Sequence, residues 1–167
     1  MEVKLMSADE RFITLANELG YDIYAENTLD DYCSPVLRRH DEVYASGLLP
    51  LLGNMLIFPG RVGADLSVAE GHQAAKITAM HGLALILQTI GSLDRIRALA
   101  RVTVYVRSTE NFTGLLEVAN GASEIFRNVL GELGKHTRTT IGVYQLPENA
   151  AVQIDIVASV DGKARLL

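Results

Sequence analysis

The sequence has 167 residues, of which 49% are hydrophobic and 21% charged, and its formal net charge is −5. This length is typical of one domain with a packed core. The acidic balance argues against a nucleic-acid partner, which needs clustered Lys and Arg. Cys33 is the only cysteine, so an intramolecular disulfide is excluded. The N-terminus carries no apolar signal region, and the longest apolar runs are too short or too interrupted to span a membrane. We therefore expect a soluble cytoplasmic protein with no membrane partner.

Capping residues and apolar periodicity predict three helices. The first begins after Ser7 and ends at Gly20. The second begins at a capping box, in which Ser67 and Glu70 satisfy each other's backbone donors, and ends at Gly91. Apolar residues occupy much of its circumference, so we expect it to be largely buried. The predicted helical ranges are residues 7–19, 68–90 and 115–133, with a short turn of helix at 94–98.

The predicted strands alternate apolar and polar residues and are bounded by turn residues. Residues 48–58 are apolar but interrupted, which predicts two short strands around a turn. The order of elements implies an α+β domain with two long helices on one face of a mixed sheet. Residues 1–32 are expected to form an extra N-terminal helix and a linker, before the main domain at residues 33–167. The strands are predicted at residues 36–39, 43–46, 102–106, 139–144 and 152–160.

Arg138 stands at the start of a predicted strand, followed by Thr139 and Thr140 and flanked by otherwise apolar sequence. A guanidinium stays charged and presents a planar fork of donors that matches a carboxylate with two hydrogen bonds. An arginine fixed on a strand is therefore a candidate clamp for a small carboxylate. The alternatives are a solvated arginine at a strand end and a salt bridge to Asp or Glu.

Four segments together form a family pattern that covers roughly residues 33–160. They are the strand ending in Ser46-Gly47, the helix start Gly63-Ala-Asp-Leu-Ser67, the passage from Val104 through Asn111-Phe112 to Asn120-Gly-Ala-Ser123, and the closing stretch from Arg138 to Val160. In order and spacing they resemble the Rid family of reactive intermediate deaminases, also called YjgF-like or L-PSP endoribonuclease-like proteins. The helix start and the Asn-Gly-Ala-Ser segment suggest a subgroup distinct from the archetypal deaminases.

The resemblance implies a chorismate-mutase-like homotrimer whose sheets line a central barrel and whose sites lie between subunits. It also implies hydrolysis of 2-imino or enamine acids to 2-keto acids and ammonia. Binding and positioning can supply most of that chemistry. By the resemblance, Arg138 binds the substrate carboxylate, the backbone near Thr140 engages the substrate, and Ser46 and Asn120 lie in or near the pocket. Local hydrogen bonding is the alternative role of Ser46 and Asn120.

The sequence departs from the archetypal pattern in the residues that handle water. The glutamate expected fifteen residues after the arginine is Gln153, which can hold a water but cannot accept its proton. Asp155 lies on the same strand face and could replace it, or could be a polar interface residue. The family's pocket tyrosine falls near Cys33, so either Tyr32 or Cys33 could fill that position.

Histidines provide no metal site, because no pair has ligand spacing and there is no C-x-x-C. We therefore expect neither a metal nor a cofactor. His81 interrupts an apolar helical run and is expected in the core or at an interface. His136, two residues before Arg138, is a further candidate at the mouth of the pocket.

The leading hypothesis is an imine or enamine deaminase in which Arg138 and Gln153 are the catalytic residues. The first alternative is a non-catalytic trimer of the same fold that binds a keto acid or a related carboxylate metabolite. The second is an endoribonuclease acting on RNA, which the net charge and the lack of a basic stripe disfavour. The third is a structural trimer in which Arg138 pairs with an acid such as Asp155.

Overall fold

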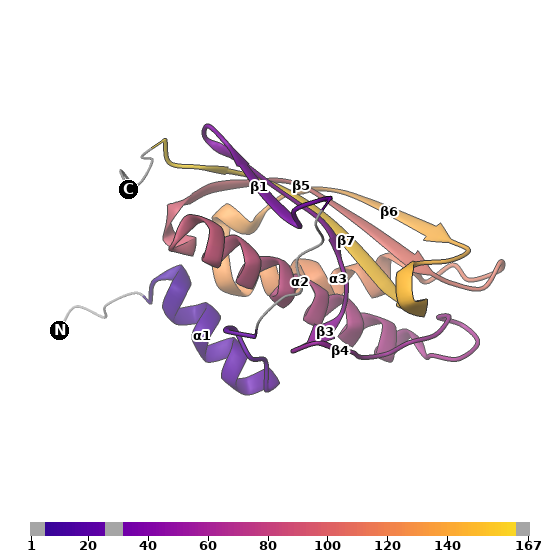
Figure 1. The fold of residues 1–167 in the computed structure, drawn as a ribbon. Helices are drawn as coiled ribbons and strands as arrows, with labels where there is room; N and C mark the ends of the chain where they lie inside the picture. The colour runs from indigo at the N-terminus through magenta and orange to yellow at the C-terminus, as the bar shows by residue number, and fades with distance from the viewer. Residues whose placement is uncertain (1–5, 26–31, 163–167) are drawn as a thin grey trace.

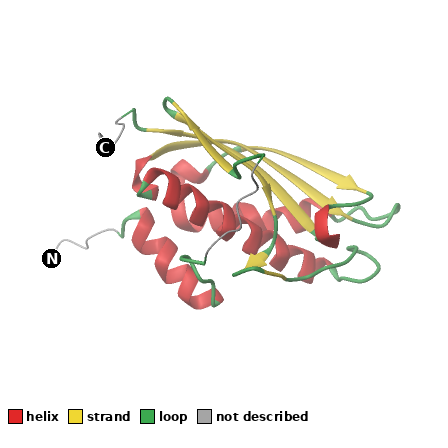
Figure 2. Cartoon of the chain, viewed as in Figure 1, coloured by secondary structure: helices red, strands yellow, loops and turns green. Residues whose placement is uncertain are grey.

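A computed structural model of the chain describes residues 6–25 and 32–162 (Figure 1). Two layers are visible, a twisted sheet above and helices below, with helices on one face of the sheet only (Figure 2). The architecture is therefore α+β. The helices are α1 (Ala8–Leu19), α2 (Val68–Ile90) and α3 (Leu115–Leu130); the strands are β1 (Val36–Arg39), β2 (Glu42–Leu48), β3 (Leu51–Leu52), β4 (Met55–Leu56), β5 (Ile96–Arg107), β6 (Thr137–Val143) and β7 (Val152–Val160).

The main sheet has the strand order β1-β2-β7-β5-β6, and β3 and β4 form a separate two-stranded ribbon. All pairs in the main sheet are antiparallel except β5 and β6, which run parallel. The sheet is therefore mixed, and β6 is one of its two edge strands. Gly47, at a φ of 70°, lies at the irregularity where the register of β2 against β7 shifts. That left-handed conformation suits glycine.

Alternate residues of the central strands point toward the helices and form the core. Val102, Val104 and Val106 of β5 are completely buried, as are Val152 and Ile154 of β7. The helix α2 is buried over most of its length, and it packs closely on α3. At their closest approach a Cβ on Gly121 would lie only 2.2 Å from the carbonyl oxygen of His72. Only glycine fits there without moving a helix.

The N-terminal helix α1 is built into the same core. Phe12 is completely buried and belongs to the cluster that includes the sheet and both long helices. The Asp9 carboxylate accepts hydrogen bonds from the Ser92 hydroxyl at 2.6 Å and the Leu93 amide at 2.7 Å, next to a short 3-10 turn. In return, Asp94 accepts a bond from the Ala8 amide at 2.7 Å. These reciprocal bonds fix α1 against the chain between α2 and β5.

The predicted helix starts and most strands are confirmed. Ser7 and Ser67 each form a complete capping box, and Gly20 and Gly91 end their helices in the left-handed conformation. The ribbon of β3 and β4 confirms the interrupted segment at residues 48–58. Among the described residues, no helix is both long enough and apolar enough to cross a membrane.

The predicted boundaries of β2 and β6 are off by one or two residues, and two other regions differ more. The expected helical turn at 94–98 is a 3-10 turn at Leu93–Arg95, and β5 already begins at Ile96. The register of β5 against β7 is irregular at two points in the first half of β5. These irregularities break the alternation of apolar and polar residues there, so the sequence pattern did not predict this part of the strand. The helix α3 ends at Leu130 rather than at residue 133, because Gly131 takes a φ of 62°.

Candidate functional site

Arg138 lies on β6 and points toward α3. The register with β5 pairs Arg138 with the buried Val102, which places both on the helix side of the sheet. Its Nη1 donates to Asn120 Oδ1 at 3.1 Å and to Ser123 Oγ at 2.8 Å, both on α3. Among the described residues, neither Nε nor Nη2 has an acceptor, and no carboxylate pairs with the guanidinium. Nη1 is therefore held by α3, while Nε and Nη2 remain available to donate to a ligand.

Ser123 connects Arg138 to His136. The Nδ1 of His136 lies 2.7 Å from the carbonyl oxygen of Gly134, so this nitrogen carries the hydrogen. In the neutral ring, Nε2 then accepts the hydroxyl proton of Ser123, at 3.0 Å. The Ser123 oxygen is left to accept the bond from Arg138. The resulting chain, Gly134 to His136 to Ser123 to Arg138, orients the guanidinium.

The surroundings of His136, chiefly its burial, favour the neutral form of its ring. Burial, and to a smaller extent the charge of Arg138, lowers the pKa of His136, while the bond to Gly134 opposes the shift. The ring also contacts the edge of Phe126, at 5.6 Å between centroids. Burial lowers the pKa of Arg138 as well, although a guanidinium remains protonated in proteins. A single fixed positive charge is thus held beside neutral hydrogen-bonding groups.

An open cavity of about 580 Å³ borders this arrangement, between β6 and the start of the turn after α3. Arg138, His136 and Thr140 line it together with basic side chains from α3 and the turn. Two of these, Arg127 and Lys135, are bridged by the exposed Glu132 at 2.8 and 2.7 Å. The hydroxyl of Thr140 is buried without a hydrogen-bond partner among the described residues. The cavity is thus suited to an anion.

Ser46 and Gln153 lie elsewhere, on the face of the sheet opposite the helices. The pairing of Gln153 with Tyr105 and of Tyr44 with Val157 defines this face. Ser46 donates to Asp155 Oδ1 at 2.8 Å, and the Gly47 amide donates to the same oxygen at 3.0 Å. Burial and Asp155 together raise the pKa of Tyr105.

The expected site residues therefore fall into separate groups. Arg138, Asn120 and Thr140 come together on the helix side of β6. The suggested pair of Arg138 with Asp155 is wrong within the chain, since Asp155 binds Ser46 and Gly47 instead. Tyr32 is 97% exposed in the segment before β1, next to the exposed Cys33.

Sequence reasoning missed Ser123 as a site residue. Its spacing of three from Asn120 on a helix places both side chains on one face, which was the available signal. His136 lines the cavity, as its position near Arg138 suggested. His81 is a core residue as predicted, 6% exposed with Nδ1 3.0 Å from the Leu49 carbonyl oxygen.

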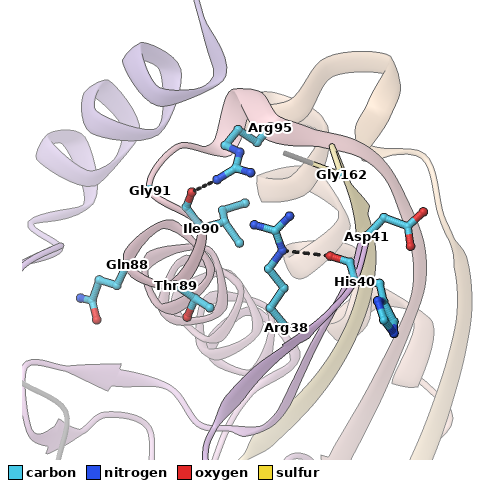
Figure 3. Close-up of a pocket in the computed structure, with 9 residues that line it drawn as sticks. All are labelled: Arg38, His40, Asp41, Gln88, Thr89, Ile90, Gly91, Arg95 and Gly162. Atoms are coloured by element: carbon cyan, nitrogen blue, oxygen red, sulfur yellow. Dashed lines mark hydrogen bonds between the residues drawn. The ribbon is translucent and has the colours of Figure 1, made fainter. Parts of the chain in front are cut away.

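A second cavity, of about 650 Å³, lies at the C-terminal end of α2, where Arg38 and Arg95 point inward (Figure 3). Arg38 donates to the carbonyl oxygens of His40 at 3.0 Å and Asp161 at 2.9 Å. Arg95 donates to the Ile90 carbonyl at 2.6 Å and forms an ion pair with the Asp161 carboxylate at 2.8 Å. These cations stabilise the carbonyl end of the helix. We therefore assign this cavity a structural role.

The described residues contain no group of three His, Cys, Asp or Glu side chains that could hold a metal ion. A layer of helices on a mixed sheet, with a cationic cavity at its parallel edge, thus defines an α+β protein with a candidate anion site.

Comparison with known proteins identifies the family. A family model described as "YjgF/chorismate mutase-like, putative endoribonuclease" matches residues 17–160. Protein TCP17 of Trypanosoma cruzi is 36% identical over 121 residues, which cover 72% of this chain and 76% of that protein. The chain therefore belongs to the YjgF, or Rid, family and has its chorismate-mutase-like fold.

Two solved structures illustrate the likeness. The protein Atu1372 from Agrobacterium tumefaciens, described as of unknown function, is 31% identical, with a TM-score of 0.81 over 92% of this chain and 95% of that one. A structure from Shewanella oneidensis described as a "putative endoribonuclease" has a TM-score of 0.84 at 22% identity, over 93% of this chain and all of the other. The second likeness is one of fold alone.

Proposed function

We propose that the protein hydrolyses 2-imino or enamine acids to 2-keto acids and ammonia, in a pocket around Arg138. Water adds to the imine carbon, both protons of the water pass to the nitrogen, the carbon–nitrogen bond breaks, and ammonia leaves. Arg138 binds the substrate carboxylate and so fixes the imine carbon in position. Positioning of this kind supplies a large part of the acceleration that such a reaction needs.

The observation that carries this proposal is that only one of the three nitrogens of the Arg138 guanidinium, Nη1, donates hydrogen bonds to described residues. Asn120 and Ser123 use Nη1 only, so the fork is oriented while other donors face an open cavity. Two parallel N–H donors match the two oxygens of a carboxylate. Thr140, the next inward residue on the same strand, places its backbone beside the bound group.

The pocket is completed between subunits of a homotrimer in this proposal. The sheet face opposite the helices is uncovered in a single chain and carries partly exposed apolar side chains, Leu37, Tyr44 and Ile141 at 42%, 41% and 40% exposure. Association through this face would bury them and bring the Ser46, Gln153 and Asp155 face of one subunit toward a neighbour. Light scattering coupled to size exclusion should then give three times the chain mass of 18.2 kDa.

The test is ammonia release from freshly generated 2-iminopropanoate. The wild type should accelerate release above the spontaneous rate, and Arg138→Ala should abolish the acceleration. Arg97→Ala is the matched control, because this arginine on β5 has a 63% exposed side chain, and the variant should leave the acceleration unchanged. Equal turnover by wild type and Arg138→Ala would refute the proposed role.

A second candidate is a metabolite-binding protein of the same architecture that does not turn its ligand over. Gln153 favours it, because an amide cannot take the proton of an attacking water. Binding of pyruvate that depends on Arg138, without imine hydrolysis by the folded wild type, would establish this candidate instead.

A further inference from the structure

We infer that the pocket selects 2-imino acids with an acidic side chain, whose second carboxylate binds Arg127 and Lys135 in the same cavity as Arg138. This inference rests on the proposed function, since it takes Arg138 as the clamp for the first carboxylate. It adds a substrate class and two residues that determine specificity.

The cavity at Arg138 is basic although the chain as a whole is acidic. The formal net charge is −5, yet the charged side chains that line this cavity in the described part of the chain are Arg127, Lys135 and Arg138. Burial lowers the pKa of His136, which lines the cavity as a neutral ring. Charges of one sign around a cavity concentrate ligands of the opposite sign. One carboxylate on Arg138 would leave two cations facing the same space.

Arg127 lies one helical turn beyond the contact between α3 and Arg138. Asn120, Ser123 and Arg127 are spaced three and four residues apart, so they share one face of α3. Ser123 Oγ accepts a hydrogen bond from Arg138 Nη1 at 2.8 Å. Since Cβ atoms four residues apart on a helix are separated by about 6 Å, Arg127 is a near neighbour of the first carboxylate site. A short substrate side chain can bring a second carboxylate to it.

The turn that follows α3 holds Lys135 at the same cavity. This 3-10 turn packs directly on the helix, because a Cβ on Gly134 would lie only 2.3 Å from the carbonyl oxygen of Phe126. The residue after Lys135 is His136, whose Nε2 lies 3.0 Å from Ser123 Oγ. The backbone on both sides of Lys135 is therefore fixed against α3, which keeps its side chain at the cavity.

Glu132 shows that a single carboxylate can bridge the two cations. Its two oxygens lie 2.8 Å from Arg127 Nη2 and 2.7 Å from Lys135 Nζ. The Glu132 side chain is 72% exposed, and ion pairs in solvent contribute little to stability. Among the described residues, Nε and Nη1 of Arg127 have no acceptor. A substrate carboxylate in the cavity can thus bind beside Glu132 or replace it.

The experiment compares kcat/KM for freshly generated 2-iminoglutarate and 2-iminopentanoate, which share a five-carbon chain and differ in the terminal carboxylate. We expect the wild type to prefer 2-iminoglutarate. The ratio of the two values should fall by about tenfold when Arg127→Gln and Lys135→Gln are combined, because hydrogen bonds to charged groups have about this worth. The two side chains are 41% and 70% exposed and both pair with Glu132, so this double variant should fold.

Two further variants separate a lost ligand contact from a general effect of charge or stability. Arg97→Ala removes a 63% exposed cation on β5 that does not line the cavity, and it should keep the wild-type ratio. Glu132→Gln removes the competing negative charge and should raise the ratio, which a loss of stability would not do.

An unchanged ratio in the double variant, or a wild type that does not prefer 2-iminoglutarate, would overturn the inference. Absence of turnover of both substrates by the folded wild type would instead refute the proposed deaminase. In that case calorimetry compares 2-oxoglutarate with 2-oxopentanoate. Tighter binding of 2-oxoglutarate that the double variant removes would support selection of an acidic side chain, and equal or absent binding of the two acids would overturn it.

Discussion

Arg138 and Gln153 lie on opposite faces of the main sheet, on strands separated by β5. Arg138 shares the helix side with Val102, whereas Gln153 lies beside Tyr105 on the other side. A substrate bound to the guanidinium of one chain is therefore out of reach of Gln153 in that chain. If both residues serve one reaction, they must come from different subunits.

Subunit mixing tests this consequence. Arg138→Ala and Gln153→Ala should each be inactive alone, because each lacks one half of every site. Unfolding the two together and refolding them should restore part of the activity, since some mixed interfaces contain both native residues. Size exclusion of the refolded sample confirms assembly. Mixed oligomers without any recovered turnover would show that the two residues do not meet across an interface.

Ser123 is expected to affect ligand binding by holding the Arg138 guanidinium in place, without contacting the substrate itself. Ser123→Ala removes one of the two acceptors of Nη1 and leaves His136 without its donor. Hydrogen bonds to charged groups contribute about 1.5–3 kcal/mol, so pyruvate should bind roughly ten times more weakly or worse. Ser159 lies on β7 and faces away from the helices, so Ser159→Ala should bind pyruvate as the wild type does. Unchanged affinity in Ser123→Ala would mean that Asn120 alone fixes the guanidinium.

The helix α1 should contribute strongly to stability although it lies outside most of the family pattern. Phe12 is completely buried, and truncation of a buried Phe to Ala costs about 3–5 kcal/mol. Ile13, its 44% exposed neighbour, is the control, and Ile13→Ala should cost much less. Urea unfolding measures both. Similar small losses for the two variants would show that α1 is dispensable.

Stability should fall as the pH drops below about 6.5, the ordinary pKa of histidine. Burial is the main cause that lowers the pKa of both His81 and His136 in the folded chain. The unfolded chain therefore binds more protons between the folded pKa values and 6.5, so acidification favours unfolding in that window. Below the folded values the effect of these groups levels off.

Urea midpoints between pH 7.5 and 5 check this dependence, and His81→Leu should make it shallower. The Glu124 carboxylate, whose pKa is lowered chiefly by Lys76, loses its stabilisation only at more acidic pH. A midpoint that stays constant or rises on acidification to pH 5 would contradict the assignment of a neutral buried His81 and a neutral half-buried His136.

Much of the fold was predictable because local signals agreed with the packing. The N-cap at Ser7 and the capping box at Ser67 marked two helix starts, and the alternating valines of β5 marked its core face. The site was predictable only in part. Arg138 and Asn120 belong to the family pattern, so the sequence predicted them. The hydrogen bonds that join His136, Ser123 and Arg138 form only because α3 lies antiparallel to β6, which no local sequence pattern predicts. The separation of Gln153 from Arg138 likewise depends on strand order.

The most direct test of the central claim is equilibrium binding of a small carboxylate. Titration calorimetry with pyruvate should be carried out on the wild type, Arg138→Ala, Arg138→Lys and the exposed control Arg97→Ala. We predict binding by the wild type and the control, its loss in Arg138→Ala, and only partial recovery in Arg138→Lys, because an ammonium cannot donate two parallel bonds. Equal affinity in the wild type and Arg138→Ala would contradict the account.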